Sequence, residues 1–497
     1  MSATCLAKLS RRAFVRSSAL GVAALPIVVA CAPTAAPTPA PAAPTPAPAA
    51  PTKPAAAAPT APEPTKPAAA APTVAPASKP AERVEISLTV PANPPDGPRY
   101  YNEVLLPTWE KAFPNVKLNI NMGPFGEFAT KLQASIAGGT VTDMFNQDDI
   151  LIPGYAARGV LRELTDYLKG DAAAFSDVYG LKNGRDPRGK QWGIPKNVYT
   201  TGLLYNQNLF DKAGVKYPDD TWTWQTFLDA ARKLTTDKAG KHPGDAGFDP
   251  KQVEVHGYWV RNYITAEWIP WVYQNGSSLL DQTRTKSNFD NPATIEAFEF
   301  TIGLIHKEHV SPPVDEIASM GAQFHVAFLS GKVAMMNHLL GQEGAWAVEL
   351  RDKFKFDAAM HPQQKARGSA DLTHQGVITT NAKNPDVCWQ FLKWAATTPA
   401  VAIPVYTLQN YGLPVIKSTW TSKEVTEGKR IIPNTKAFTD ALDKGYGRDL
   451  EPNAVWNEWV TAAARGLDPA YEGKLPVKDA LANVHKDVQA ILGRFYY

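Results

Sequence analysis

Few residues of this 497-residue sequence have the type and spacing that catalysis or metal binding requires. The chain contains no Gly-Xaa-Ser-Xaa-Gly elbow, no phosphate-binding loop, no Gly-Xaa-Gly-Xaa-Xaa-Gly turn and no His-Glu-Xaa-Xaa-His motif. His306 and His309 share one face of a predicted helix, but no third ligand is apparent, so a surface pair is the better interpretation. Scattered carboxylates could form a glycosidase pair, which sequence spacing cannot show. The sequence therefore predicts no catalytic residue, no metal and no cofactor.

Cys31 is placed for a covalent modification. The sequence Val28-Val29-Ala30-Cys31 resembles a bacterial lipobox, in which a peptidase cuts before the cysteine that receives the lipid. The preceding apolar run, Ala19–Ala30, would form a helix of about 18 Å, shorter than the roughly 30 Å core of a bilayer. Residues 1–30 are therefore predicted to be a signal peptide, and Cys31 the lipid-bearing anchor to the membrane; a stray cysteine after an apolar run is the alternative.

The basic start of the chain indicates a particular export route. Ser10-Arg11-Arg12-Ala13-Phe14-Val15-Arg16 looks like a twin-arginine signal, and a generic basic segment is the alternative. The predicted location is outside the cytoplasm, on the bacterial cell membrane.

Residues 31–80 are predicted to be a disordered tether. Ala32 to Pro80 contains 20 Ala, 16 Pro and 7 Thr, and proline removes amide donors and fixes φ. Residues 1–80 hold 7 of the 51 Lys and Arg and 1 of the 48 Asp and Glu, so residues 81–497 have 44 against 47. The net charge of +3 becomes −3 for this part, which argues against a nucleic-acid partner.

Alternating strands and helices predict an α/β fold after residue 81. Residues 84–90 and 116–121 alternate between apolar and polar residues as strands do, and residues 143–146 look like a third strand. Helices are predicted at 101–113, 128–136, 223–234 (with Thr223 as the cap), 291–306, 322–329, 385–396 and 477–495, with a short strand at 333–336. Cys388 has apolar neighbours at helical spacing and reads as a core thiol. Open parallel sheets bind ligands beyond the carboxyl ends of their strands, which places Asp148, Asp149 and a Gly154-Tyr155 turn at such an end.

Five motifs occur in a recognisable order along residues 81–497. They are Trp192-Gly193-Ile194-Pro195; Leu203-Leu204-Tyr205-Asn206 through Trp222-Thr223-Trp224; Phe328-Leu329-Ser330-Gly331-Lys332-Val333-Ala334-Met335; Gly376-Val377-Ile378-Thr379-Thr380-Asn381 through Phe391-Leu392; and Asn410-Tyr411-Gly412-Leu413-Pro414-Val415. In this order the motifs resemble family 1 extracellular solute-binding proteins, the sugar-capturing lipoproteins of ABC importers and relatives of maltose-binding protein.

The resemblance implies a periplasmic-binding-protein-like type II α/β fold, with two lobes, a hinge of crossing strands and a cleft between the lobes. The strands would cross near 198–199, 375–377 and 413–415, so that lobe one is 84–197 plus 377–414 and lobe two is 198–376 plus 415–497. The implied function is capture of a carbohydrate, either a mono- or oligosaccharide or a similar polyol, by a monomer that delivers it to an ABC permease. A surface glycoside-active enzyme and a ligand-sensing protein that acts with a receptor are the alternatives.

Sugar sites combine aromatic rings, which stack on C–H faces, with polar side chains that bond hydroxyl groups. The resemblance places ten residues at the cleft: Asp149, Tyr199, Trp259, Asn262, Trp268, His338, Trp346, His374, Gln375 and Trp456. For Asp149 a loop acid or helix cap is the alternative, and for Tyr199 a packed hinge aromatic. Some of the tryptophans must belong to the core. The motif around Trp346 departs from the family pattern, because Leu339-Leu340-Gly341-Gln342-Glu343 lengthens the turn before it.

Overall fold

The structure is a computed structural model that describes residues 83–92, 96–319, 324–339, 353–409, 412–427 and 434–494. All of them belong to one compact unit, Glu82–Tyr497. Cys31 and Trp346 lie outside the described residues. No helix within the described ranges combines the length and apolar character that crossing a membrane requires.

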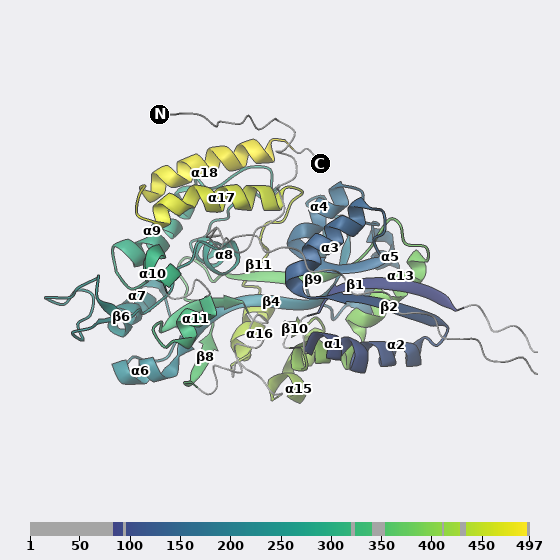
Figure 1. The fold of residues 1–497 in the computed structure, drawn as a ribbon, viewed down its shortest axis with the longest axis horizontal. Coiled ribbons are helices and arrows are strands. Elements are labelled where there is room, and N and C mark those ends of the chain that lie inside the picture. Colours follow the sequence, from purple (N-terminus) through teal and green to yellow (C-terminus); the bar gives the residue numbers. More distant parts are fainter. Residues whose placement is uncertain are drawn as a thin grey trace, which may run out of the picture. The chain divides into compact units, whose positions relative to one another are not determined.

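Three parallel strands form one end of the main sheet, as the alternating sequence predicts. β1 (Val84–Pro91) pairs on one side with β2 (Val116–Gly123) and on the other with β3 (Met144–Asp148) (Figure 1). Leu88 of β1 lies between Ile120 and Met144, and is 1 % exposed. The apolar positions of the alternation thus face the core.

Helices cover both faces of this part of the sheet (Figure 1). Their bounds are α1 (Asp96–Tyr100), a π-helical turn (Tyr101–Leu105), α2 (Leu106–Ala112), α3 (Phe125–Ala137), α4 (Ile152–Ala157), α5 (Thr165–Gly170), α13 (Pro385–Thr397) and α14 (Pro399–Thr407). Leu88 packs in one apolar cluster with residues of α13 and α14, while Phe145, which points to the other face, packs with residues of α3 and α4. Cys388 is a buried free thiol in the first of these clusters, which confirms it as a core residue.

Two local predictions were wrong in this region. The predicted helix 101–113 begins earlier, at Asp96, and is interrupted by the π-helical turn. Pro107, near the start of α2, has no amide hydrogen for an intrahelical bond, and the turn immediately before it accommodates that loss. Gly154 and Tyr155 lie inside α4 and not in a turn, because Pro153 favours the first turn of a helix.

A single strand, β4 (Gly193–Asn206), runs through both parts of the sheet. Its first half pairs antiparallel with β9 (Ser369–Ile378) and β10 (Leu413–Pro414). Its second half pairs antiparallel with β7 (Met335–Leu339) and β8 (Phe356–Ala359). β9 in turn pairs with β3 at its end and with β11 (Gly447–Arg448) at its start. β4, β9 and β10 include the three predicted crossing points, while the lobe boundaries drawn from them stay a prediction.

The second part of the unit packs helices around a large aromatic core. The helices and turns are α6 (Gln207–Ala213), α7 (Trp224–Leu234), a π-helical turn (Ile264–Trp268), α8 (Ile269–Gln274), α9 (Pro292–His306), α10 (Val314–Ser319), α11 (Phe324–Leu329), α15 (Lys423–Thr426), α16 (Lys436–Asp443), α17 (Trp456–Tyr471) and α18 (Val477–Leu492), with a short hairpin of β5 (Thr236–Asp237) and β6 (Val253–Val255). Thr223 caps α7 as predicted: its hydroxyl accepts a hydrogen bond from Thr226 N at 3.3 Å. α17 and α18 lie side by side (Figure 1).

Candidate functional site

The carboxyl ends of strands from the two parts of the sheet face each other at the crossing. β3 ends at Asp148, which is opposite His374 of β9. β7 runs in the opposite sense and ends at Leu339, opposite Thr201 of β4. Between these ends lies a short stretch of β4 centred on Tyr199. Because open α/β sheets bind ligands beyond the carboxyl ends of their strands, this crossing is the candidate ligand site.

Asp148, His374 and Tyr199 form a polar and aromatic cluster at the crossing. Nε2 of His374 lies 2.5 Å from Oδ1 of Asp148, and the His374 ring meets the Tyr199 ring edge to face, with centroids 5.3 Å apart. Tyr199 and His374 are 3 % and 5 % exposed. The cluster offers an imidazole, a carboxylate and a phenol at one place, which is the mixture that binds hydroxyl groups.

Gly412 fixes the third crossing segment against this cluster. Its φ is +72°, and a Cβ there would lie 2.7 Å from Asn197 Nδ2 and 2.8 Å from Val198 O. Only glycine combines this backbone conformation with so close an approach. The segment leading into β10 therefore lies directly on β4 beside Tyr199.

Asp149 is buried in a network of hydrogen bonds that joins the end of β3 to β9. Its Oδ2 accepts bonds from Asn183 Nδ2 at 3.0 Å, and from Thr373 N and Oγ1 at 2.9 Å each. Burial raises the pKa of this carboxyl well above its usual value. Gln375, also buried, donates from Nε2 to Thr373 Oγ1 at 2.5 Å. The structure thus brings Asp149 and Gln375 together, in a network whose other members are protein groups.

On the side of the crossing where β7 lies, the segment 259–263 runs alongside that strand. Trp259 bridges to Met336 in parallel, and Arg261 Nη2 donates to Asn337 O at 2.7 Å. The Arg261 guanidinium lies over the Trp259 ring at 5.7 Å and over the Tyr263 ring at 5.5 Å. This segment therefore follows β7 toward its carboxyl end and carries Tyr263 as its exposed aromatic residue.

Tyr263 is 38 % exposed and is the one aromatic residue among the exposed large apolar side chains of the described ranges. By contrast, Trp259 is 3 % exposed, and His338, opposite Gly202, is 1 % exposed. An exposed ring with a guanidinium beneath it is a flat surface on which another flat surface can stack. Sequence reasoning missed Tyr263, although its position next to Asn262 in an aromatic-rich segment was a signal.

Three other predicted site residues are held by packing. Asn262 donates from Nδ2 to Ala464 O at 2.9 Å and to Asp468 Oδ1 at 2.8 Å. Trp268 packs in the aromatic core near Phe289 and Phe298. Trp456 is 8 % exposed and donates from Nε1 to Leu450 O at 2.8 Å. The structure does not bring Trp268 into the crossing cluster.

The segment after β3 contacts the segment before α17. Ile150 and Leu151 pack against the apolar cluster that contains Trp456, and a Cβ on Gly154 would lie 3.2 Å from Ala454 O. The segment before α17 is itself held by Glu451, whose φ is +53°. Glu451 accepts bonds from Tyr273 OH at 2.7 Å, and from Leu279 N at 3.1 Å and Leu280 N at 2.5 Å. Burial raises the pKa of Glu451 to about 8.

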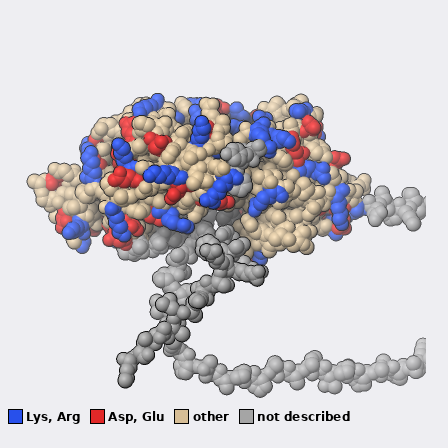
Figure 2. All heavy atoms as spheres, turned by 90° about the horizontal axis from the view of Figure 1, so that it is seen from above, with Lys and Arg blue, Asp and Glu red and all other residues tan. Residues whose placement is uncertain are grey.

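Charge is mixed over the surface of the unit. Figure 2 shows basic and acidic side chains interspersed over the face it presents. Within the described residues, no three His, Cys, Asp or Glu side chains gather as they would to hold a metal ion.

Three comparisons place the chain among known proteins. The profile of the bacterial extracellular solute-binding protein family matches residues 91–402. A putative binding protein of Brucella abortus is 25 % identical over 418 residues, which cover 82 % of this chain and 93 % of the relative. The arabinooligosaccharide-binding protein of Bacillus subtilis is 22 % identical over 369 residues, covering 70 % and 76 %.

Solved structures share the fold. An ABC substrate-binding protein of Listeria monocytogenes in complex with cycloalternan has a TM-score of 0.68 and 22 % identity, covering 83 % of this chain and 99 % of that one. The sugar-binding protein MalE of Xanthomonas citri also has a TM-score of 0.68, with 16 % identity and coverage of 83 % and 98 %. The expected type II fold is therefore confirmed. The family profile spans more than half of the sequence, and the chain belongs to the family of bacterial extracellular solute-binding proteins.

Proposed function

We propose that this chain binds a carbohydrate at the strand crossing and delivers it to an ABC importer without changing it chemically. The observation that carries the proposal is the cluster of Asp148, His374 and Tyr199 at the strand crossing. An exposed aromatic ring, Tyr263, is carried by the segment that lies alongside β7. A sugar presents C–H faces that stack on a ring and hydroxyl groups that bond to carboxylate and imidazole. The names of relatives support this class, since one binds arabinooligosaccharides and another erythritol and L-threitol.

The predicted site residues take different roles in this proposal. Tyr199 and His374 would contact the ligand at the crossing, and the buried His338 would hold β7 against β4 beside them. Trp346, which lies outside the described residues, would be a further ligand contact. Trp259 supports Arg261 and thereby Tyr263. Asp149 and Gln375 position β9 against the end of β3 through Thr373. Asn262, Trp268 and Trp456 hold the walls of the site in place.

Binding would close the two lobes, 84–197 plus 377–414 and 198–376 plus 415–497. A ligand that contacts both walls only in the closed arrangement favours that arrangement by its extra contacts. Support comes from β4 and β9, which each pair with strands on both sides of the crossing, so that a small change in backbone angles there moves one lobe relative to the other.

After export, residues 31–80 would hold this unit at the cell surface, where it would act as a monomer. Cleavage after residue 30 and acylation of Cys31 would anchor the chain in the membrane, and residues 31–80 would serve as the spacer. Export by the twin-arginine route would deliver the unit already folded. Its partners would be the carbohydrate and the ABC permease, with no nucleic acid.

A thermal-shift screen against neutral mono- and oligosaccharides and polyols tests the proposal. A true ligand at a hundredfold excess over its Kd stabilises the folded state by about 2.7 kcal/mol. Tyr263→Ala should weaken binding of that ligand by up to about tenfold, because a stacking contact contributes about 0.5–1.5 kcal/mol. The matched control is Val326→Ala, since Val326 is also 38 % exposed and lies in α11. The proposal fails if no carbohydrate shifts the melting temperature, if the ligand is consumed, or if Tyr263→Ala binds as tightly as the control.

A further inference from the structure

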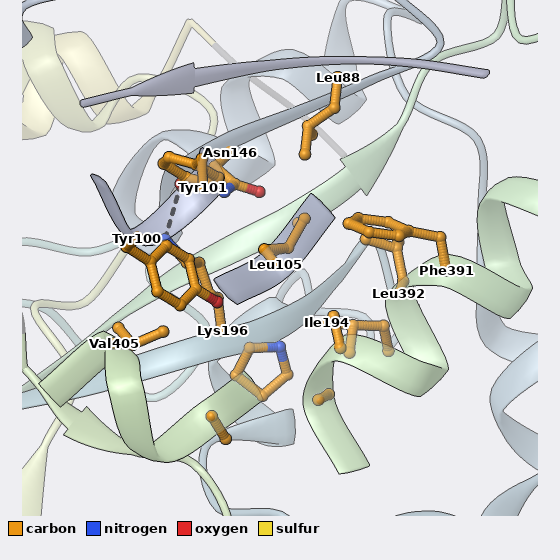
Figure 3. Close-up of a pocket in the computed structure, with 15 residues that line it drawn as sticks. Leu88, Tyr100, Tyr101, Leu105, Asn146, Ile194, Lys196, Phe391, Leu392 and Val405 are labelled. Atoms are coloured by element: carbon orange, nitrogen blue, oxygen red, sulfur yellow. Dashed lines mark hydrogen bonds between the residues drawn. The ribbon is translucent and has the colours of Figure 1, made fainter. Parts of the chain in front are cut away.

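A second feature of the unit is a pocket between the sheet and the helices α1, α13 and α14. Its lining comes from strands of the sheet and from the segment 100–105, α13 and α14. Figure 3 shows Leu88, Leu105, Ile194, Phe391, Leu392 and Val405 around it, with Tyr100, Tyr101, Asn146 and Lys196 as the polar members. The lining is thus mostly apolar, and Lys196 is its one cationic side chain.

Lys196 lies two residues after Ile194 on β4, so the alternation of the strand points both side chains into this pocket. The register of β4 against β9 shifts between Pro195 and Asn197, so Lys196 is the extra residue of a β-bulge. Its neighbours, Pro195 and Asn197, keep their partners on β9.

The amine of Lys196 is held by neutral groups alone. Nζ donates a hydrogen bond to Tyr101 OH at 2.8 Å and lies over the rings of Tyr101, at 4.9 Å, and Tyr100, at 5.2 Å. Tyr100 and Tyr101 are also the other titratable residues that line the pocket. No carboxylate of the described ranges forms an ion pair with Lys196.

We propose that Lys196 is a nucleophilic amine that forms an imine with small aldehydes entering this pocket. The lone pair of Nζ attacks the carbonyl carbon, and the new C–N bond gives a carbinolamine. The carbinolamine then loses water and becomes the imine, with a C=N bond. The oxygen of this water comes from the aldehyde, and both of its hydrogens come from the neutral amine. No oxidant or reductant is needed for this step, because the aldehyde and the amine together contain every atom of the imine and the water.

The protonation state of Lys196 supports this reactivity. Burial lowers the pKa of Lys196 to about 7, so about half of the amine is neutral at pH 7. An ordinary lysine, with a pKa of about 10.4, is neutral about once in 2500 molecules at that pH. Nucleophilicity falls with basicity, by about thirtyfold over this interval if amines follow the slope known for thiols. The remaining advantage of Lys196 over a surface lysine is about fortyfold.

Reductive trapping with glycolaldehyde and cyanoborohydride tests the proposal on the full-length chain. Peptide mass spectrometry at short times, between pH 6 and pH 10, gives the rate for each lysine of one sample. Internal references are Lys131 and Lys307, whose side chains are 68 % and 83 % exposed. Lys196 should be modified about 10 to 100 times faster than either at pH 7, and its rate should level off above about pH 8 while theirs continue to rise.

One variant tests whether the fast modification requires the amine of Lys196 itself. Lys196→Arg keeps a cation and removes the nucleophile, so the fast modification should disappear while Lys131 and Lys307 react as before. The result on the unmodified sequence decides the question even if this variant does not fold. The proposal is overturned if Lys196 reacts no faster than Lys131 at pH 7, or if its rate rises in parallel with that of Lys131 up to pH 10.

Discussion

Asp149 could either stabilise the fold through its hydrogen-bond network or contact the ligand directly. Two substitutions of Asp149 distinguish these roles. Asp149→Ala removes the acceptor of three donors: Asn183 Nδ2, Thr373 N and Thr373 Oγ1. Asp149→Asn keeps one oxygen that can accept the same three bonds and cannot ionise. We expect the alanine variant to lose stability without any ligand, and the asparagine variant to stay close to the unmodified chain at about pH 4, where burial keeps Asp149 protonated in the folded state.

The magnitude follows from the donors that alanine would leave without an acceptor. A buried donor without a partner costs about 1–3 kcal/mol. Two of the three donors keep or can find another acceptor: Asn183 Nδ2 also lies 3.5 Å from Asp371 O, and the Thr373 hydroxyl can rotate. The backbone amide of Thr373 cannot, so it bears the full cost of an unpaired buried donor. Removing a buried carboxylate recovers part of its desolvation penalty. The net loss for Asp149→Ala is about 1–3 kcal/mol, which for a unit of roughly 400 residues lowers the melting temperature by about 1–4 °C.

The pH dependence gives an independent check with a definite sign. Because burial raises the pKa of Asp149, the folded state holds its proton at pH values where the unfolded state has lost it. The stability from this proton is complete below the unfolded pKa of about 3.9 and is lost as the pH rises through the folded pKa. Asp149→Asn should therefore gain on the unmodified chain as the pH rises from 4.

Urea unfolding followed by tryptophan fluorescence, without ligand, measures both effects. The same variants are then titrated with the carbohydrate found in the screen. If Asp149→Ala unfolds at the same urea concentration as the unmodified chain but has lost its ligand, the carboxylate acts on the ligand and the network reasoning is wrong.

Two further substitutions test other parts of the unit. Glu451, with its pKa raised by burial to about 8, is protonated when folded and ionised when unfolded between about pH 4.5 and 8, so the free energy of unfolding should fall over that window. Glu451→Gln should flatten that fall in urea titrations, and an unchanged slope would show that Glu451 does not cause it. Gly412→Ala should cost about 2–3 kcal/mol, because its Cβ would lie 2.7 Å from Asn197 Nδ2 in addition to the strain of positive φ. Gly139→Ala, with φ +68° and nothing within 4 Å, should cost only about 1 kcal/mol, and equal losses in chemical denaturation would rule out the close approach at residue 412.

Local patterns in the sequence were enough to predict most of the elements. β1 and β2 alternate between apolar and polar residues, and the structure pairs them from Val84 opposite Val116 onwards. Thr223 was recognised as a cap because the hydroxyl needs only the amide three residues later. The predictions failed where backbone geometry depends on proline, at the π-helical turn before Pro107 and in the helix that contains Gly154.

The sequence could place the candidate site but could not rank its aromatic residues. Trp268 and Tyr263 lie five positions apart, yet one is in the core and the other is 38 % exposed. That difference depends on contacts with distant parts of the chain, since Trp268 packs against Phe298 of α9 and Asn262 bonds to Ala464 O of α17. The position of Asp149 after a strand could be predicted, because it depends on local sequence. Its role could not, because its partner Thr373 is 224 positions away.

The reach of β9 has a consequence for how this chain is made. Met144 of β3 pairs with Ile378, which the ribosome adds roughly 230 residues later. At about 5–20 residues per second, one edge of β3 waits on the order of 10–50 s for its neighbour. An exposed strand edge can pair with other chains during that interval. The first part of the sheet therefore cannot be completed as it is synthesised, and the nascent chain has to be kept from aggregating until residues 369–378 have emerged.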